Sequence, residues 1–183
     1  MGSAERVLRR IEGSDRWRYL PIVGRDRGRV LIELVRRHRP RRILEVGTFV
    51  GYSAILMGRE LGRDSEIVTI EIDREVAELA RRNIQEAGIE PRVEVMVGDA
   101  LEIIPEVKGE FDMVFLDADK GEYFEYLRLV EGKLRKGSVV VADNVRSSSY
   151  SMRDYLDHVR NSGLYESRFI RAGWDGMEVS VRL

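Results

Sequence analysis

Acidic, amide and lysine side chains follow two apolar segments in the second half of the chain. Asp117 and Lys120 come after FDMVFL, and Asp143 and Asn144 come after VVVA. If these segments are neighbouring strands about 4.8 Å apart, the side chains of Asp117, Asp143 and Asn144 converge on one point. Oxygen ligands suit Mg²⁺ or another hard divalent cation such as Mn²⁺. Any one of these residues alone could be a surface charge or a turn cap, but together they favour a functional site that Lys120 can reach.

A glycine-bearing turn follows an earlier apolar segment, ILEV. It reads Glu45-Val46-Gly47-Thr48-Phe49-Val50-Gly51-Tyr52-Ser53 and leads into a predicted helix. A dinucleotide-binding fingerprint would have a glycine where Phe49 stands, because the backbone there approaches a pyrophosphate. A cofactor without phosphates, such as S-adenosylmethionine, does not need that glycine. By itself, the turn is equally compatible with an ordinary strand-to-helix connection.

Two more strand ends carry carboxylates. Glu71 follows VTI and is placed to accept hydrogen bonds from ribose hydroxyls. Asp73 is the better N-cap for the next helix, which leaves Glu71 for a ligand. The third strand ends in Gly98-Asp99-Ala100, where Asp99 either accepts from an adenine amine or caps the helix that follows. Both interpretations of Asp99 stay open, and they are compatible with each other.

The elements that position these residues alternate between strand and helix. This alternation predicts one Rossmann-like, doubly wound α/β fold with a mostly parallel seven-stranded sheet and an antiparallel edge strand. Residues 1–183 form a single domain, with helix and loop over 1–24 covering a core over 25–183. Ligands of such sheets bind at the carboxyl ends of the strands. The predicted strands are 42–46, 66–70, 92–97, 111–116, 138–142, 164–170 and 177–183, and the predicted helices are 24–37, 53–61, 74–87, 100–104, 122–134 and 150–161.

Composition excludes several classes of protein and site. The 183 residues suffice for one domain, and a net charge of -1 gives no general attraction to nucleic acid or anionic membranes. The chain has no cysteine, which excludes disulfides, thiolate catalysis and thiolate metal sites. No apolar run approaches the roughly 20 residues of a membrane span. We therefore expect no membrane association and a cytoplasmic location.

These motifs resemble the cation-dependent O-methyltransferases related to the catechol and caffeoyl-CoA O-methyltransferases. The resemblance covers residues 24–145, with a weaker similarity in Asp175-Gly176-Met177. ILEVGTFVGYSA is similar to the family's first cofactor motif, VTIEID to its ribose-binding motif and VGDALEIIP to its adenine loop. FDMVFLDADKGEY and VVADNV are similar to its metal and catalytic motifs and are the most specific. The chain departs from the catechol enzyme at Asp119, where that enzyme has an aromatic residue.

The resemblance implies a function and a set of roles. The chain would transfer a methyl group from S-adenosylmethionine to a hydroxyl of a small phenol- or catechol-like molecule. Lys120 would be the general base, beside a metal held by Asp117, Asp143 and Asn144. The residues implied to contact the cofactor are Val23, Glu45, Gly47, Phe49, Ser53, Glu71, Ile72, Gly98, Asp99, Ala100 and Asp117.

Other functions stay open. Some bacterial members of this family methylate 5-hydroxyuridine in tRNA, and the basic run 36–42 suggests phosphate binding. That run precedes the first strand, so we expect it at the edge opposite the cofactor; Arg16, Arg18 and Arg146 are better placed for phosphates. A non-catalytic S-adenosylmethionine-binding scaffold is a second alternative, although it would not need its ligand and base residues kept together. A nicotinamide dehydrogenase lacks the glycine at 49 and a second domain.

The remaining candidates are aromatic. His38 and His158 do not follow strands, so we interpret both as surface or packing residues. Trp17 and Trp174 flank segments that would cover the carboxyl edge of the sheet, where they either border the acceptor pocket or pack in the core. Homodimers are common in the family, so a homodimer is a further expectation.

Overall fold

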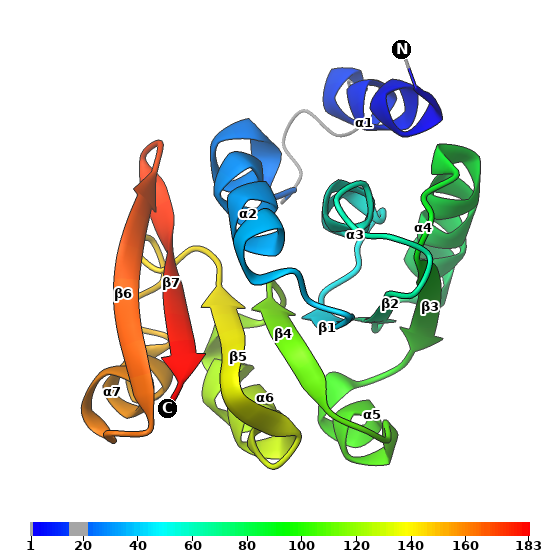
Figure 1. Ribbon diagram of the computed structural model, residues 1–183. Helices are drawn as coiled ribbons and strands as arrows, with labels where there is room; N and C mark the ends of the chain where they lie inside the picture. The colour runs from blue at the N-terminus through cyan, green and yellow to red at the C-terminus, as the bar shows by residue number, and fades with distance from the viewer. Residues whose placement is uncertain (1, 15–21) are drawn as a thin grey trace.

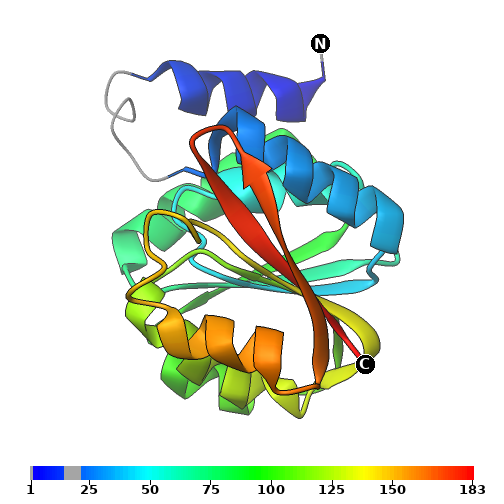
Figure 2. The same cartoon turned by 90° about the vertical axis from the view of Figure 1, so that its left-hand side faces the viewer.

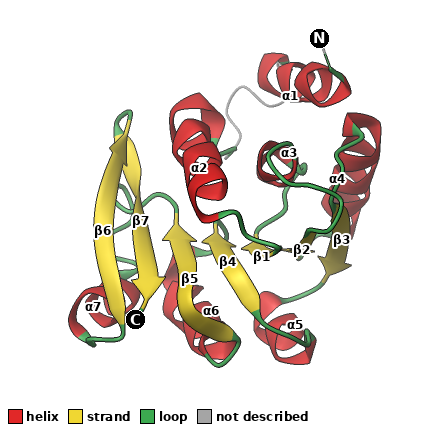
Figure 3. Ribbon diagram, viewed as in Figure 1, coloured by secondary structure: helices red, strands yellow, loops and turns green. Residues whose placement is uncertain are grey.

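The structure is a computed structural model that describes residues 2–14 and 22–183. It forms a seven-stranded sheet with helices on both faces (Figures 1 and 3). Arg16, Trp17 and Arg18 lie outside the described residues. The strands are β1 (Arg42–Val46), β2 (Glu66–Glu71), β3 (Arg92–Val97), β4 (Phe111–Leu116), β5 (Leu134–Ala142), β6 (Tyr165–Ala172) and β7 (Asp175–Arg182). The helices are α1 (Ser3–Gly13), α2 (Gly24–His38), α3 (Tyr52–Gly58), α4 (Arg74–Ala87), α5 (Ala100–Glu106), the 3₁₀ turn η2 (Lys120–Glu122), α6 (Tyr123–Glu131) and α7 (Arg153–Asn161).

The sheet has the strand order β3-β2-β1-β4-β5-β7-β6. Strands β1 to β5 are mutually parallel, and β7 pairs antiparallel with both β5 and β6. The predicted doubly wound sheet is therefore confirmed, with its antiparallel addition on the β5 side. The antiparallel strand is β7, which lies between β5 and the outermost strand β6. The strand order reverses between β1 and β4, where sheets of this kind bind their ligands.

Helices cover the apolar side chains on both faces of the sheet. Helices α1 to α4 lie on one side and α5 to α7 on the other, as Figure 2 shows. On the first face, Leu31 of α2 and Ile55 of α3 pack with Ile43 of β1; on the second, Leu127 of α6 packs with Val114 of β4. Runs such as MVFL and VVVA are continuously apolar because their residues alternate between these two cores.

Several predicted boundaries were wrong. The helix expected over 122–134 begins at Tyr123 and ends at Glu131, the helix expected over 53–61 ends at Gly58, and β5 begins at Leu134 instead of Ser138. The 3₁₀ turn η2 precedes α6, and Gly132 follows the last residue of α6. The start of β5 is polar and pairs with β4 through an irregular register after Phe111, so no apolar run marks it. The helix expected over 150–161 starts three residues later, at Arg153.

Helix α1 packs on α3 and α4 rather than on the sheet (Figure 1). Glu12 at its end accepts hydrogen bonds from Tyr52 Oη at 2.6 Å and from Arg25 Nη2 at 2.8 Å, which ties α1 to α3 and α2. The division of one domain into a cover over 1–24 and a core over 25–183 stays a prediction. None of the helices formed by residues 2–14 and 22–183 is long and apolar enough to cross a membrane.

Candidate active site

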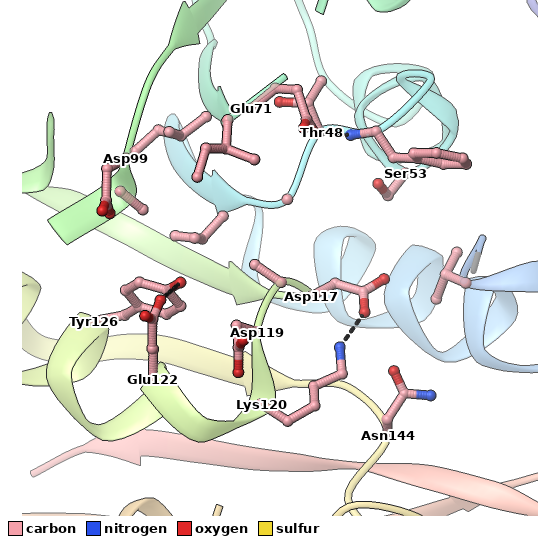
Figure 4. Close-up of a pocket in the computed structure, with 18 of the residues that line it drawn as sticks. Thr48, Ser53, Glu71, Asp99, Asp117, Asp119, Lys120, Glu122, Tyr126 and Asn144 are labelled. Carbon is pink, nitrogen blue, oxygen red and sulfur yellow. Dashed lines mark hydrogen bonds and ion pairs between the residues drawn. The ribbon is translucent and has the colours of Figure 1, made fainter. Parts of the chain in front are cut away.

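A cavity of about 530 Å³ opens at the carboxyl ends of β1, β2, β3 and β4. Each strand end is joined to the next by a backbone bond: Gly47 donates to Ile70 at 3.0 Å, Gly98 to Glu71 at 2.9 Å and Asp117 to Val46 at 2.9 Å. These hydrogen bonds bring residues from four distant parts of the chain together in one cavity wall. Its lining residues include Val23, Gly47, Thr48, Phe49, Ser53, Glu71, Ile72, Gly98, Asp99, Ala100, Asp117, Asp119, Lys120, Glu122, Tyr126 and Asn144 (Figure 4).

The turn after β1 needs glycine for a steric reason. Gly47 has a φ of 100°, and a Cβ on it would collide with the backbone carbonyl of Asp117. Phe49 also has a positive φ, 48°, an uncommon conformation for a residue with a side chain. Its backbone N–H donates to Glu71 Oε2 at 2.7 Å, which helps to hold the turn against the end of β2. The turn therefore approaches β4 and β2 closely while leaving the cavity open.

Glu71 and Asp99 combine structural contacts with a place in the cavity wall. Glu71 accepts from the backbone N–H groups of Phe49 and Asp73, the latter at 3.1 Å. Asp73 caps α4, as predicted, by accepting from the backbone N–H groups of its first turn. Asp99 caps α5 by accepting from Leu101 N at 2.8 Å and also lines the cavity. Both interpretations of Asp99 are therefore compatible with its position.

Glu45 lies beneath the cavity rather than in its wall. Its side chain is fully buried and accepts from Thr69 Oγ1 at 2.6 Å, and Thr69 Oγ1 lies 2.6 Å from Thr48 Oγ1. Burial raises the pKa of Glu45 to about 7, while the nearby hydroxyls of Ser53 and Thr69 oppose the rise. Both Ser53 and Thr48 do line the cavity. Glu45 therefore acts on the cavity through its neighbours in this structure.

A lysine–aspartate pair lies at one side of the cavity. Lys120 Nζ donates to Asp117 Oδ1 at 2.7 Å and to Tyr123 Oη at 2.8 Å (Figure 4). Tyr123 Oη in turn donates to the carbonyl of Leu116 at 2.8 Å. Burial raises the pKa of Asp117, and the positive charge of Lys120 opposes that rise. The ammonium group is thus fixed by one charged and one neutral acceptor, and the tyrosine is anchored to the strand that carries Asp117.

Asp143 and Asn144 lie next to this pair because β5 follows β4 in the sheet. Asp143 N donates to Leu116 O at 3.0 Å, so the two aspartates leave adjacent strands at the same level. Burial and the nearby charge of Asp117 raise the pKa of Asp143 to about 7. The φ of Asn144 is 60°, which turns its side chain to the cavity, and Figure 4 shows its amide oxygen pointing toward Asp117 and Lys120.

The donor set around Asp143 fits a hard divalent cation. Asp143 Oδ1 accepts from Asn144 N at 2.8 Å, whereas Oδ2 is buried and has no hydrogen-bond partner within residues 2–14 and 22–183. A buried carboxylate oxygen without a donor is costly unless a cation compensates it. The same part of the chain has no group of three or more His, Cys, Asp or Glu side chains that could hold a metal. The available set is instead two carboxylates and an amide oxygen.

Two charged residues that the sequence analysis did not assign to the site lie behind these ligands. Asp175, 1% exposed, accepts from Ser147 Oγ at 2.6 Å, from Arg146 N at 2.8 Å and from Asn144 Nδ2 at 3.4 Å. Burial would raise the pKa of Asp175, but these hydrogen bonds outweigh it and lower the pKa. Arg27 Nη1 lies 3.5 Å from Asp143 Oδ2 and 3.9 Å from Asp175 Oδ2.

The structure thus brings most of the predicted site residues together. All the predicted cofactor residues line the cavity except Glu45, and Lys120 and Asn144 line it as well. Asp143 lies behind the wall at 1% exposure. The sequence analysis missed Glu122, Tyr126 and the supporting residues Arg27 and Tyr123. The spacing KGEY could have indicated Tyr123, which stands one helical turn beyond Lys120, but no local pattern indicates Arg27.

Comparisons with a family model and with known sequences agree on the same family. The family model for O-methyltransferases matches residues 6–158. Catechol O-methyltransferase B of Danio rerio is 37% identical over 174 residues, which are 88% of this chain and 65% of that protein. The Sus scrofa catechol O-methyltransferase is 40% identical over 79% of this chain and 80% of its own length. The Mycobacterium tuberculosis enzyme is 42% identical over 67% of this chain and 56% of its own length.

Solved structures show the same fold. The O-methyltransferase TomG of Streptomyces achromogenes, in complex with S-adenosylmethionine, superposes with a TM-score of 0.86 and 31% identity, covering 98% of this chain and 89% of that one. An O-methyltransferase of Bacillus cereus in complex with S-adenosylhomocysteine gives a TM-score of 0.87 and 28% identity, covering 99% and 90%. With the family model matching most of its length, the chain belongs to the O-methyltransferase family of the catechol type.

Proposed function

We propose that this chain is an S-adenosylmethionine-dependent O-methyltransferase that uses a divalent metal and acts on a hydroxyl of a small phenol- or catechol-like molecule. The observation that carries this proposal is the Lys120–Asp117 pair beside the Asp143 oxygen that has no hydrogen bond within the described residues, at one side of a cavity of about 530 Å³. Complexes of similar O-methyltransferases with S-adenosylmethionine and its demethylated product support the choice of methyl donor.

The cavity wall offers a partner for each part of that donor. Glu71 would accept hydrogen bonds from the ribose hydroxyls, because its carboxylate faces the cavity at the end of β2. Asp99 would accept from the adenine amine. The other residues that would contact the adenine are Ile72, Gly98 and Ala100. The methionine portion would contact Val23, Gly47, Phe49, Ser53 and Asp117. Glu45 would support Ser53 from below the cavity wall.

Asp117, Asp143 and Asn144 would hold Mg²⁺ or Mn²⁺, since their oxygens suit a hard cation. When bound, such an ion supplies positive charge that lowers the pKa of an adjacent acceptor hydroxyl. Asp143 would contribute Oδ2, the oxygen that lacks a hydrogen bond. Asp175 would keep the amide of Asn144 oriented through its contact with Nδ2. Outer carboxylates commonly orient metal ligands in this way.

Lys120 would remove the acceptor proton. Its Nζ is fixed by Asp117 and Tyr123, so the nitrogen is held at one place on the cavity wall. Engagement of Asp117 with a metal would leave Tyr123 as the remaining anchor of the amine. The cavity would align the acceptor oxygen with the methyl carbon and sulfur of the donor, and such alignment is worth roughly 7–11 kcal/mol in well-oriented reactions.

Small aromatic acceptors are favoured by the names of the relatives, several of which are catechol O-methyltransferases. No contact in the described structure favours tRNA. In the basic run 36–42, Arg36 pairs with Glu60 and Arg42 with Glu66, both at 2.7 Å, at the amino end of β1 and away from the cavity. A cytoplasmic location and a homodimer remain part of the proposal, to be tested by fractionation and by light scattering.

Transfer of a labelled methyl group from S-adenosylmethionine to catechol tests the proposal. We expect Mg²⁺-dependent transfer that EDTA abolishes and that Lys120→Ala lowers by about 10²-fold or more. Lys136, exposed on β5, gives a matched control, and Lys136→Ala should leave the rate unchanged. Binding of S-adenosylhomocysteine without transfer to catechol, caffeate or other phenols would favour the scaffold alternative, and salt-dependent binding of bulk tRNA would favour the RNA alternative.

A further inference from the structure

A partly buried arginine from the first turn of α2 lies behind the proposed metal ligands. The side chain of Arg27 is 16% exposed, and those of Asp143 and Asp175 are each 1% exposed. Within residues 2–14 and 22–183, neither Arg27 Nη1 nor Asp143 Oδ2 has a hydrogen-bond partner, although the two atoms lie 3.5 Å apart. Arg27 and Asp143 therefore form an ion pair without a hydrogen bond between these two atoms.

The rest of the guanidinium is held by backbone carbonyls. Arg27 Nε donates to Val23 O at 3.0 Å and Nη2 donates to Ile22 O at 3.3 Å. These two bonds fix the position of the charge independently of the carboxylates. Because Ile22 and Val23 also line the cavity, the arginine joins the metal site to the wall of the cavity.

The charge balance of the cluster shows what this arginine does. When all three carboxyl groups are ionised, as cation binding requires of the ligands, Arg27 and Lys120 face Asp117, Asp143 and Asp175, which leaves one negative charge in excess. Without Arg27 the excess would be two. Charges in a buried site interact strongly because water and salt screen them poorly. A fixed positive charge beside Asp143 must therefore oppose the binding of a second cation there, and it must also stabilise the carboxylates while no cation is bound.

We propose that Arg27 is a resident counter-ion of the metal site, which neutralises Asp143 and Asp175 in the metal-free protein and weakens the binding of the divalent cation. The inference rests on the proposed function, because it takes Asp143 as a metal ligand. Arg27 is a positioning residue, since the guanidinium acts through Asp143 and is not placed against a reacting atom. Because Arg27 lowers the affinity of the site for the cation, the bound metal exchanges readily instead of being held permanently.

Titration of the full chain with Mn²⁺ alone tests this, with free Mn²⁺ followed by electron paramagnetic resonance and no methyl donor or acceptor present. We expect Arg27→Gln to bind Mn²⁺ about tenfold more tightly than the wild type, and Arg27→Lys to stay within about threefold of it, because only the first removes the charge. Arg29 is exposed on the same helix, so Arg29→Gln removes an equal charge from the surface and should leave the affinity unchanged.

Thermal unfolding supplies a second readout. Metal-free Arg27→Gln should unfold at a lower temperature than the wild type, because two buried carboxylates lose their counter-ion, and Mn²⁺ should raise its midpoint by more than it raises that of the wild type. Arg27→Met keeps the aliphatic part of the side chain and removes the charge, so it is a second neutral variant if Arg27→Gln does not fold. It should also bind Mn²⁺ about tenfold more tightly than the wild type.

Unchanged or weaker Mn²⁺ binding by folded Arg27→Gln would overturn the inference, as would unchanged or weaker binding by folded Arg27→Met. These results would leave the proposed methyl transfer intact. If the wild type itself bound no Mn²⁺, the metal site and this inference would fall together, and S-adenosylhomocysteine binding would show whether the methyl-donor site still stands.

Discussion

At the level of single residues, the cavity depends on groups that never enter its wall. Glu45 is fully buried under Ser53 and Thr69, and its pKa of about 7 means that the folded chain binds the proton more tightly than the unfolded chain, where the ordinary value is 4.5. Its contribution to stability is therefore fully present below about pH 4.5. That contribution is lost as the pH rises through about 7.

Replacing this carboxyl by an amide should remove that pH dependence. The free energy of unfolding of Glu45→Gln, relative to the wild type, should increase between pH 5 and pH 8 by up to about 3 kcal/mol. Urea unfolding across this range measures the difference, and the other titrating groups cancel in the comparison. Glu106→Gln, an exposed change, is the control and should show no pH trend. A flat difference for Glu45→Gln would mean that Glu45 titrates normally.

Tyr123 matters through its hydroxyl, which connects Lys120 to the carbonyl of Leu116. In Tyr123→Phe the ring still fills the core, but the amine loses one of its two anchors. We expect kcat for methyl transfer to fall about tenfold, the loss of one hydrogen bond to a charged group, with KM for the acceptor and the affinity for S-adenosylhomocysteine unchanged.

A matched tyrosine separates positioning from stability in that experiment. Tyr165 also donates a hydrogen bond from its hydroxyl, in this case to the carboxylate of Glu131 at 2.8 Å, but it lies on β6 away from the cavity. Tyr165→Phe should leave kcat unaltered. Equal losses of kcat in both variants, or a rise in KM with unchanged kcat for Tyr123→Phe, would contradict the positioning role.

At the level of elements, the sequence was sufficient where patterns are local. Largely apolar runs predicted β1 and β4 to the residue, and Asp73 and Gly88 marked the ends of α4. The start of β5 escaped prediction because Arg135 and Lys136 are exposed and carry no apolar pattern. Its pairing comes from contact with β4, a tertiary effect that a sequence window cannot contain.

The site residues also fall into those that the sequence predicts and those that it does not. Residues that directly follow strands, such as Asp117, Asp143 and Glu71, were found because the fold fixes where strand ends meet. Arg27 and Asp175 were not assigned to the site because their roles depend on contacts between the start of α2, the end of β5 and the start of β7. Such contacts join residues 31 or more positions apart, and no spacing in the sequence encodes them.

The turn after β1 provides a test at this scale. Gly47→Ala places a methyl group against the carbonyl of Asp117 at a backbone φ of 100°. We expect a loss of about 2 kcal/mol or more in unfolding free energy, and weaker S-adenosylhomocysteine binding because the turn must move away from β4. Gly62→Ala is the control, since its Cβ meets open space. Calorimetry measures both quantities, and identical behaviour of the two variants would refute the steric account.

At the level of the whole molecule, the N-terminal helix is linked to the cavity through side chains. Glu12 of α1 bonds to Tyr52, which lines the cavity, and to Arg25 of α2. A ligand that fixes the cavity wall should therefore also stabilise α1. Ligand binding stabilises every segment whose ordered conformation is coupled to the binding site. If residues 1–24 cover the same domain as 25–183, then α1 and the sheet should also unfold in one transition.

Hydrogen exchange with and without S-adenosylhomocysteine examines this coupling. We expect the ligand to slow amide exchange in α1 as well as in the loops after β1 and β2, and Glu12→Ala to abolish the effect in α1 while weakening ligand binding by about threefold. Glu5 lies on the same helix and pairs with the exposed Arg9 and with Arg59, so Glu5→Ala is the matched control and should keep the ligand-dependent protection. Protection confined to the strand-end loops would show that α1 is attached to the domain without sharing in ligand binding.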